Sequence, residues 1–337
     1  MATGIMLVVA ASLGCGSDRL RAPMNYMHGH GPVASSEARL GWWLVIVSGA
    51  VVAVVALLVV LAAVRRPGRR DAATPERTRA PGGSMWIYLG GLLVPALILV
   101  VSFAFTLGTL HATARPPREP AVTVRIIGHR WWWEVKYLDP DSTKTIVTAN
   151  ELHVPVGQPV RLELTSADVI HSFWIPQLAG KTDVIPGQTN IAWLQADSAG
   201  VYRGACTEYC GLQHANMAAI VVAEAPPGFA QWQMTQRGAA AVPSDPAAAA
   251  GQLVFLKSAC VTCHAVRGSA AAGRVGPDLT HLATRSTLAA GTLQNTRGNL
   301  AGWIVNSQAI KPGNDMPAMT LLPNDLRALL EYLETLK

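Results

Sequence analysis

Charged residues are scarce in this chain of 337 residues. Only 14% are Asp, Glu, Lys or Arg, half are hydrophobic, and the mean hydropathy is +0.27. A positive mean hydropathy is unusual for a soluble protein, so we expect membrane segments beside more than one core. Residues 65–80 carry about +4 of the net charge of +6, against about −3 for 121–225 and about +2 for 245–337. Without a basic face on either globular part, a nucleic-acid partner is not expected.

Charge is absent altogether from residues 41–64 and 86–110. Each stretch is long enough, as a helix, to cross a bilayer core of about 30 Å. A buried helix of a soluble protein is the alternative, which the length and the lack of charge disfavour. The connecting segment, 65–85, is rich in arginine, so the positive-inside rule predicts that it is cytoplasmic. The sequence therefore predicts two transmembrane helices, with everything after them on the outer face.

No basic residue precedes the apolar run that opens the chain. Residues 1–20 otherwise resemble a signal or lipoprotein segment, with small residues leading to Cys15. Cleavage or lipid attachment at Cys15 is one interpretation, and an uncleaved segment is the other.

Cysteine is also rare, at five residues, and a second Cys-x-x-Cys pair that could complete a zinc site is missing. The existing pair lies in Cys260-Val-Thr-Cys263-His264, the signature of covalent haem c attachment with an axial histidine. A methionine would complete the axial ligands and raise the haem potential. Met316 is favoured because the following proline resembles the ligand loop of cytochrome c. Met319 is the reserve candidate, and His281 a less favoured one.

The other cysteines form a second group of metal-capable side chains. Two thiols, an imidazole and a thioether lie close together, at Cys206, Cys210, His214 and Met217, with His171 upstream. Soft sulfur donors combined with imidazole favour copper and electron transfer, and a thioether argues against structural zinc. A disulfide between the two cysteines is the simpler alternative, because the outer face is oxidising.

Alternating apolar and polar residues mark residues 120–225 as a β-sandwich. Strands are predicted at 122–127, 160–165, 190–195 and 218–222, with Pro- and Gly-containing turns between them. A segment rich in Pro, Gly and Ala, 226–248, is predicted to be a linker, with a helix beginning near Pro246. Residues 249–337 are predicted to form an all-α class I cytochrome c domain.

The order Cys-x-Glu-x-Cys-x-x-x-His-x-x-Met, with a histidine about thirty-five residues earlier, resembles the binuclear copper (CuA) site of cytochrome c oxidase subunit II. The resemblance implies a cupredoxin-like sandwich in which Cys206 and Cys210 bridge two coppers. It also implies one terminal histidine per copper, His171 and His214, and Met217 as a weak ligand. Glu208 would bind through its carbonyl, and its carboxylate would face Mg²⁺ at the interface with subunit I.

Three adjacent tryptophans, Trp131 to Trp133, cannot all point into one core from a strand. They resemble the aromatic segment of subunit II, which implies that Trp131 is the electron entry point and that Trp133 packs beside the metal domain. An interfacial belt above the membrane is the alternative for Trp132 and Trp133. The resemblance further implies contacts with the catalytic subunit, from Asp168, Lys181 and Asp183.

These features predict subunit II of a haem-copper oxidase with a fused cytochrome c domain, in the bacterial inner membrane. Electrons from cytochrome c or a cytochrome bc complex would reach the haem, then CuA, then the oxygen-reducing site of subunit I, with subunit III in the same complex. The alternatives are the copper and haem subunit of a membrane nitric oxide reductase, and a tethered copper-delivery protein. A copper chaperone has no need of a covalent haem, and a quinol oxidase subunit would lack the copper ligands.

Overall fold

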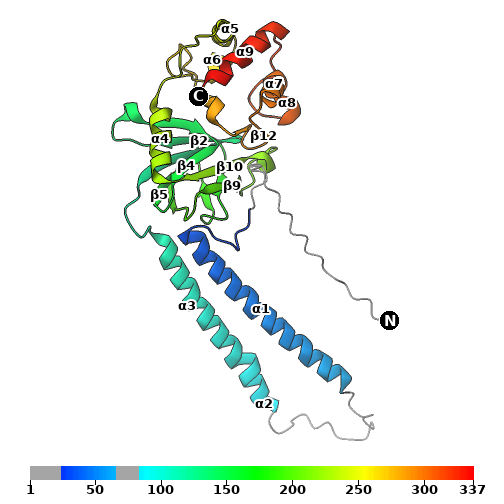
Figure 1. Ribbon diagram of the computed structural model, residues 1–337. Helices are drawn as coiled ribbons and strands as arrows, with labels where there is room; N and C mark the ends of the chain where they lie inside the picture. The colour runs from blue at the N-terminus through cyan, green and yellow to red at the C-terminus, as the bar shows by residue number, and fades with distance from the viewer. Residues whose placement is uncertain (1–23, 66–82) are drawn as a thin grey trace.

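A computed structural model describes residues 24–65 and 83–337. A helical hairpin, a β-sandwich and a small helical domain follow one another in the chain and are arranged in that order in space (Figure 1). The helical domain therefore lies on the side of the sandwich remote from the hairpin. The predicted segment 1–20, Cys15 and most of the arginine-rich loop lie outside the described residues.

The hairpin consists of two long apolar helices. The first, α1, spans Pro32–Val64; the second is built from α2 (Gly83–Trp86), the π-helical η2 (Ile87–Leu93) and α3 (Val94–Ala114). Both are long and apolar enough to cross a membrane. The predicted spans lie within these helices, but α1 begins earlier because its first turns pack on the sandwich and bury Val33, Ala34 and Ala38.

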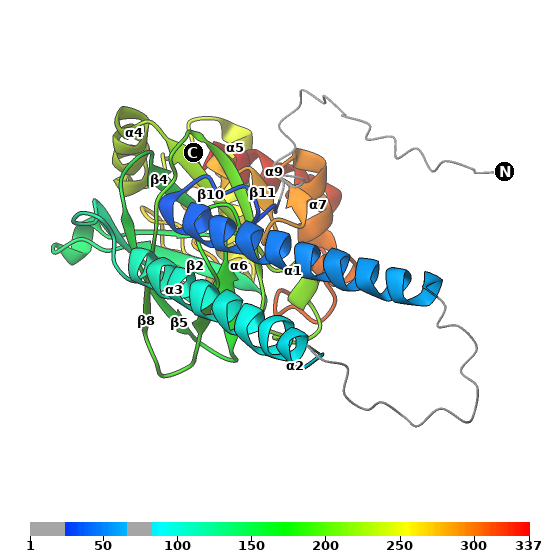
Figure 2. The ribbon, with the colours of Figure 1, turned by 90° about the horizontal axis from the view of Figure 1, so that it is seen from below.

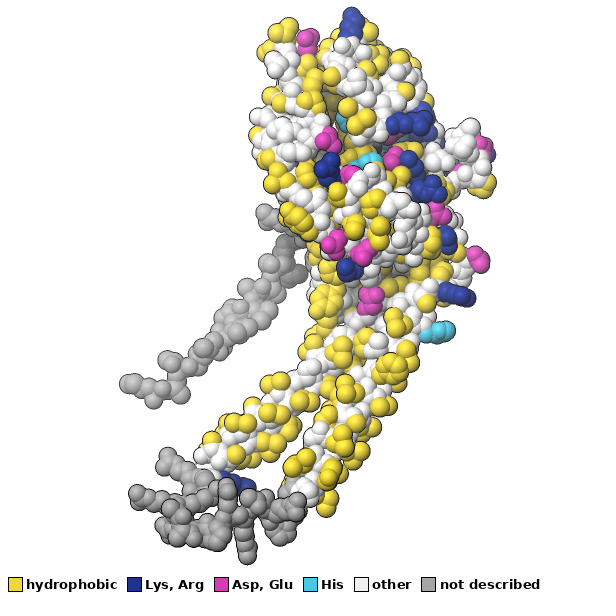
Figure 3. Space-filling model, turned by 180° about the vertical axis from the view of Figure 1, so that it is seen from behind, with side chains coloured by type: hydrophobic (Ala, Val, Ile, Leu, Met, Phe, Trp, Pro, Cys, Tyr) yellow, Lys and Arg dark blue, Asp and Glu magenta, His cyan; other side chains and the backbone are white. Residues whose placement is uncertain are grey.

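The two helices lie side by side (Figure 2). Trp43 of α1 donates its indole N–H to Ser102 Oγ of α3 at 3.2 Å, and its ring centroid lies 6.2 Å from that of Phe105. Hydrophobic side chains cover the outer surface of both helices, whereas charged side chains gather on the globular part (Figure 3). Such exposed apolar surface is suited to lipid or to other membrane helices.

Two five-stranded sheets form the sandwich, with strand orders β3-β2-β1-β5-β8 and β4-β10-β9-β6-β7. The pairs β1–β5 and β4–β10 are parallel and the other pairs are antiparallel. Buried side chains alternate along the strands, most clearly in β5, so the core lies between the sheets. The strands are β1 (Val122–His129), β2 (Trp132–Tyr137), β3 (Ile146–Ala149), β4 (Glu151–Pro155), β5 (Val160–Ser166), β6 (His171–Trp174), β7 (Thr182–Val184), β8 (Asn190–Leu194), β9 (Gly200–Cys206) and β10 (Ala218–Glu224). The sandwich predicted from the sequence is confirmed.

Helix α4 (Pro226–Arg237) occupies part of the segment predicted to be a linker. Its Trp232 ring stacks on His153 with the ring centroids 4.3 Å apart, and its Phe229 is buried against the sandwich. The aromatic residues of this segment thus anchor it as a helix despite its many Pro, Gly and Ala residues. The expected helix at Pro246 is present as α5 (Pro246–Lys257), capped by the Asp245 carboxylate.

The C-terminal domain is mainly helical and has its own core. Aromatic and leucine side chains of α5 and α9 meet there, including Phe255, Tyr332 and Leu333. Its remaining elements are α6 (Cys260–Cys263), η5 (Leu282–Thr284), β11 (Thr287–Leu288), β12 (Leu293–Gln294), α7 (Arg297–Val305), α8 (Ser307–Ile310) and α9 (Pro323–Thr335). Two further 3-10 turns, η3 (Ser142–Lys144) and η4 (His214–Asn216), belong to the sandwich.

Candidate metal and haem centres

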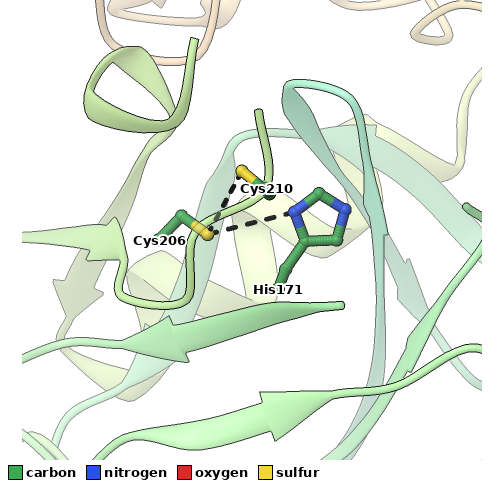
Figure 4. A group of neighbouring side chains, drawn as sticks. All are labelled: His171, Cys206 and Cys210. Atoms are coloured by element: carbon green, nitrogen blue, oxygen red, sulfur yellow. Dashed lines mark hydrogen bonds between the residues drawn. The ribbon is translucent and has the colours of Figure 1, made fainter. Parts of the chain in front are cut away.

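The first site lies at one end of the sandwich, where adjacent strands of one sheet start and stop. His171 begins β6, and Cys206 ends β9, which pairs with β6. The loop after β9 then turns back, so that Cys206 N–H donates to the Met217 carbonyl at 2.9 Å. The loop thereby places Cys210 beside Cys206 and His171 (Figure 4). Ligands far apart in the chain therefore meet because of the strand pairing.

The donor atoms form a chain with the two sulfurs at its centre. Cys206 Sγ lies 3.7 Å from Cys210 Sγ and 3.9 Å from His171 Nδ1. Cys210 Sγ lies 3.7 Å from His214 Nδ1 and 3.9 Å from the Met217 sulfur. The Glu208 carbonyl oxygen is 3.2 Å from Cys206 Sγ. Each sulfur thus has a histidine of its own, and all six residues singled out by the sequence are brought together.

Both cysteines are free thiols, so the disulfide alternative is not observed. Each is only 4% exposed, and His171 and Met217 are also buried. His214 is partly exposed. A set of two thiols, two imidazoles and a thioether is suited to copper, because soft sulfur and imidazole are the ligands that copper prefers. The residues present therefore fit a copper centre.

Hydrogen bonding between the two sulfurs favours a thiolate at Cys206 and a thiol at Cys210. The Cys210 thiol and, less strongly, His171 lower the pKa of Cys206 to about 3, while the same pairing raises the pKa of Cys210. Burial opposes protonation of His171, but its bonds to Asp168 and Cys206 outweigh this and raise its pKa. Asp168 Oδ1 lies 2.8 Å from His171 Nε2, which turns Nδ1 towards the sulfurs. A carboxylate that orients a ligand histidine is typical of metal sites.

The second site is an apolar cavity in the C-terminal domain, reached by Cys260, Cys263 and His264. The short helix α6 carries both thiols, which are free and partly exposed. His264 Nδ1 lies 2.7 Å from the Pro277 carbonyl and donates to it, so Nε2 is the nitrogen left for an iron. Gly276 allows this approach, because a β-carbon there would lie 2.7 Å from His264 Cε1.

A buried arginine also fits a haem in this cavity. Arg285 lines the cavity, is 9% exposed, and its Nε has no hydrogen-bond partner. Burial lowers the pKa of its guanidinium. An unpartnered, buried guanidinium N–H is suited to a carboxylate such as a haem propionate. No pattern in the sequence distinguishes this arginine from surface arginines.

Met316 and Met319 both line the cavity, so either could reach a bound iron. The backbone of Met316 is more firmly held: its carbonyl accepts from Ser307 Oγ and Gln308 Nε2, and its N–H donates to Asn314 Oδ1 at 2.9 Å. His281 faces elsewhere, because its ring nitrogens lie 2.8 Å and 3.1 Å from carbonyl oxygens of Lys337 and Gly238. Its ring is therefore occupied by the protein backbone.

The three tryptophans have different surroundings. Trp131 is 8% exposed and donates its indole N–H to the Cys210 carbonyl at 3.0 Å. Trp132 stacks on His129 with ring centroids 4.4 Å apart, and Trp133 is fully buried, edge-on to His171 and Phe173. The interfacial belt alternative is therefore wrong for Trp133, because it belongs to the sandwich core. The expected packing of Trp133 beside the metal ligands is observed.

Trp131 and Trp132 also line the cavity that contains His264. The copper loop is on the other side of Trp131, where a β-carbon at Gly211 would lie 3.2 Å from the ring. A β-carbon at Gly313 of the C-terminal domain would lie 3.7 Å from the same ring. Trp131 thus lies between the two sites, covered by both domains. The sequence did not predict this covering, because no local pattern shows how two domains pack.

Other charged residues named from the sequence lie on the sandwich surface. Lys181 and Asp183 are about half exposed and form an ion pair at 3.6 Å. The Asp168 carboxylate accepts from the backbone N–H of Arg130 at 2.7 Å, besides its bond to His171. Glu208 is partly buried, with its carbonyl at the sulfur pair. Asp168 therefore supports the metal ligands as well as facing outward.

Three parts together define a membrane-anchored electron-transfer protein. They are a membrane hairpin, a β-sandwich with a Cys, His and Met cluster, and a helical domain with a Cys-x-x-Cys-His cavity. Residues 137–225 match the family described as the periplasmic domain of cytochrome c oxidase subunit II, and residues 248–337 match the cytochrome c family. Cytochrome c oxidase subunit 2 of Alkalihalophilus pseudofirmus is 34% identical over 80% of this chain and 78% of its own length. The protein of the same name from Bacillus subtilis is 32% identical over 76% of each chain.

The chain therefore belongs to the cytochrome c oxidase subunit 2 family. Among solved structures it is similar to the periplasmic domain of subunit II of cytochrome oxidase from Bradyrhizobium japonicum. The two proteins are 31% identical in sequence and superpose with a TM-score of 0.34. The match covers 36% of this chain and 96% of the Bradyrhizobium japonicum domain. The family, the cupredoxin-like sandwich and the fused cytochrome c domain predicted from the sequence are confirmed.

Proposed function

We propose that this subunit accepts electrons at a haem c in its C-terminal domain and passes them through a binuclear copper centre to the oxygen-reducing site of subunit I. The observation that carries the proposal is the pair of adjacent sulfurs with one histidine on each side. Two bridging thiolates spread one electron over two metals and so reduce the rearrangement that electron transfer requires. When bound, copper and haem supply the one-electron chemistry.

In this proposal the copper ligands have distinct tasks. Cys206 and Cys210 would bridge the metals, since their sulfurs are central in the cluster. His171 and His214 would each bind one copper, and Asp168 would hold the His171 ring in place. The remaining ligands would be the Met217 sulfur and the Glu208 carbonyl.

For the haem, Cys260 and Cys263 would form the covalent attachments and His264 would be one axial ligand. The Pro277 carbonyl supports this role because it fixes the imidazole tautomer. Met316 would be the second axial ligand, supported by its three backbone hydrogen bonds. Arg285 would pair with a haem carboxylate inside the cavity.

Trp131 would act within the chain instead of receiving electrons directly from an external protein. Its ring is covered by the haem domain and bonded to the copper loop, which supports a place between the two centres. An external donor, cytochrome c or a cytochrome bc complex, would then deliver electrons to the haem domain. This revises the role of external electron entry that the sequence resemblance implied.

We place the subunit in the bacterial inner membrane, where α1 and α3 would contact lipid and subunit I, with subunit III in the same complex. Both globular domains would lie on the outer face, as the name of the matching periplasmic family supports. The Glu208 carboxylate would meet Mg²⁺ at the interface with subunit I, since hard cations prefer oxygen ligands. Lys181 and Asp183 would contact the same subunit.

The test is to record EPR and visible–near-infrared spectra of the full-length chain, purified in detergent after haem attachment and copper loading. We expect a delocalised two-copper signal together with a low-spin haem. Cys206→Ser should abolish the two-copper signal and leave the haem spectrum unchanged, because the haem domain has its own core. A single-copper signal in the unmodified chain would contradict the proposal.

Met217→Leu offers a finer test of the ligand set. The methionine sulfur is buried beside Cys210, so its loss should change the copper spectrum without releasing both metals. Met234→Leu is the matched control, since Met234 is 60% exposed on α4. An unchanged copper spectrum in Met217→Leu would remove Met217 from the ligands.

A further inference from the structure

A buried lysine lies where the two globular domains meet. Lys311 follows α8 and is 3% exposed. Its Nζ donates to the carbonyls of Trp131 at 2.8 Å, Asn216 at 2.7 Å and Ala289 at 3.0 Å. An ammonium group has three donors and no acceptor, so three carbonyls satisfy it fully. Lys311 therefore joins three separate segments of the chain by directional bonds.

These segments belong to the two redox sites. Trp131 lies between the haem cavity and the copper loop, and Asn216 directly precedes Met217. Lys311 itself lies on the loop that leads to Met316. The Lys311 side chain also lines the haem cavity. One side chain thus links the copper loop, the backbone of the intervening tryptophan and the haem pocket.

A second polar contact crosses the same interface. Glu151, at the start of β4, is 2% exposed, and its Oε1 accepts four hydrogen bonds from the C-terminal domain. Ser286 donates through its N–H at 2.8 Å and its Oγ at 2.6 Å, and Thr287 through its N–H at 2.9 Å and its Oγ1 at 3.1 Å. One oxygen of the buried carboxylate is therefore hydrogen-bonded entirely by groups of the other domain.

Backbone groups complete the contact between these two anchors. Ala218 N–H of the sandwich donates to the Ala290 carbonyl of the haem domain at 3.0 Å. Gln213 Nε2 of the copper loop donates to the Pro312 carbonyl at 2.8 Å. Polar bonds from several separate segments thus hold the two domains together.

Polar anchors of this kind specify orientation more than they add stability. Burying a charge is costly unless hydrogen bonds compensate for it, and apolar packing of similar size would often stabilise as well. Directional bonds from a cation on one domain and an anion on the other allow few relative orientations. Orientation matters here because electron transfer between two centres depends steeply on the distance between them.

We propose that Lys311 and Glu151 are positioning residues that hold the haem domain in one fixed orientation on the copper domain, so that electrons cross between them without domain motion. This inference rests on the proposed function of the two centres. Other cytochrome domains on flexible tethers would need to search for their docking site. Here the docked arrangement is the resting one.

The experiment uses the full-length chain in detergent, loaded with haem and copper. A light pulse excites an added ruthenium complex, which gives one electron to the haem and is then reduced by a sacrificial amine. The arrival of the electron at copper is followed in the near infrared at increasing glycerol concentration. We expect a rate independent of viscosity in the unmodified chain. Lys311→Met should slow the transfer by about tenfold or more, since misplacing reacting groups by about 1 Å can cost on the order of a hundredfold. Its transfer rate should also fall as viscosity rises.

Lys257→Met is the matched control, because Lys257 is an exposed lysine of the same domain. It should behave as the unmodified chain. Glu151→Ala is the second variant; Glu151 is not one of the proposed metal ligands, and this change too should make the rate depend on viscosity. Hydrogen exchange at the Ala218 amide should accelerate in both interface variants, because that amide bonds across the interface.

Rates that stay fast and independent of viscosity in both Lys311→Met and Glu151→Ala would overturn the inference. A second result would also overturn the inference: changed haem or copper spectra in Lys311→Met together with normal transfer in Glu151→Ala. Lys311 would then support the structure of a redox site and not the orientation of the domains. Failure of the proposed function would look different: the unmodified chain would then lack a two-copper acceptor.

Discussion

Single residues in the two sites depend on neighbours that restrict their orientation. Asp168 turns Nδ1 of His171 towards the sulfurs, and the Pro277 carbonyl leaves Nε2 of His264 for the haem. In both cases a hydrogen bond to one ring nitrogen determines which nitrogen remains for a metal. The protein itself therefore orients both imidazole rings.

The choice between Met316 and Met319 can be tested at this scale. Met316→Leu should remove the far-red absorption typical of a sulfur-ligated haem and lower the haem potential, because an axial methionine raises it. Met319→Leu is the natural control, as it has similar burial and lines the same cavity. Visible spectra and a redox titration of the full chain would decide. Loss of the band only in Met319→Leu would reverse the assignment.

Among the secondary-structure elements, α5 and α9 determine the shape of the haem domain. They cross closely at Gly251, where a β-carbon would lie 1.8 Å from the Ala328 carbonyl oxygen. Phe255 and Tyr332 pack on each other at the same crossing. A small residue at this position thus lets the two helices approach and close the core beneath the cavity.

Gly251→Ala should therefore destabilise the haem domain. Overpacking of this kind costs about 1–3 kcal/mol. Gly302→Ala in α7 is the matched control: no atom lies within 4 Å of its added β-carbon, so it should stabilise by about 0.5–1 kcal/mol through helix propensity. Chemical unfolding followed by haem absorbance measures both. Equal stability of the two variants would show that the helices can move apart without cost.

Across the whole molecule, the three parts are ordered by their distance from the membrane helices. The hairpin is at one end, the copper sandwich lies in the middle, and the haem domain lies at the far end (Figure 1). An electron that enters the haem domain would therefore move towards the membrane as it passes to copper. The order of the domains in the sequence, hairpin first and haem last, is the reverse of this path.

The membrane topology gives a prediction at the same scale. In a Cys15→Ser background, Ser142→Cys should react with a membrane-impermeant maleimide in intact cells, because Ser142 is exposed on the sandwich. Ala72→Cys, in the segment between the helices, should react only after permeabilisation, since the arginine-rich segment is expected to stay in the cytoplasm. Labelling of Ala72→Cys in intact cells would contradict the two-pass orientation.

Much of the fold and of both sites could be predicted from the sequence, because the signals are local or periodic. The apolar stretches, the alternating strands, the Cys-x-x-Cys-His motif and the Cys206 to Met217 loop all follow from spacing along the chain. His171 lies far upstream of this loop in the sequence, and the structure brings it to the same cluster. Helix α4 was missed because its Pro and Gly content indicated a linker, whereas tertiary contacts of Trp232 and Phe229 stabilise a helix.

The way in which the two redox sites meet could not be predicted from the sequence, because it depends on contacts between distant segments. Lys311, Glu151 and Arg285 have no motif around them, and their roles depend on partners far away in the chain. Trp131 is covered for the same reason, because the surface that would face an external donor is occupied by the haem domain. Sequence spacing encodes which ligands a loop can offer, but the contact between two domains depends on the shapes and charges of both folded surfaces.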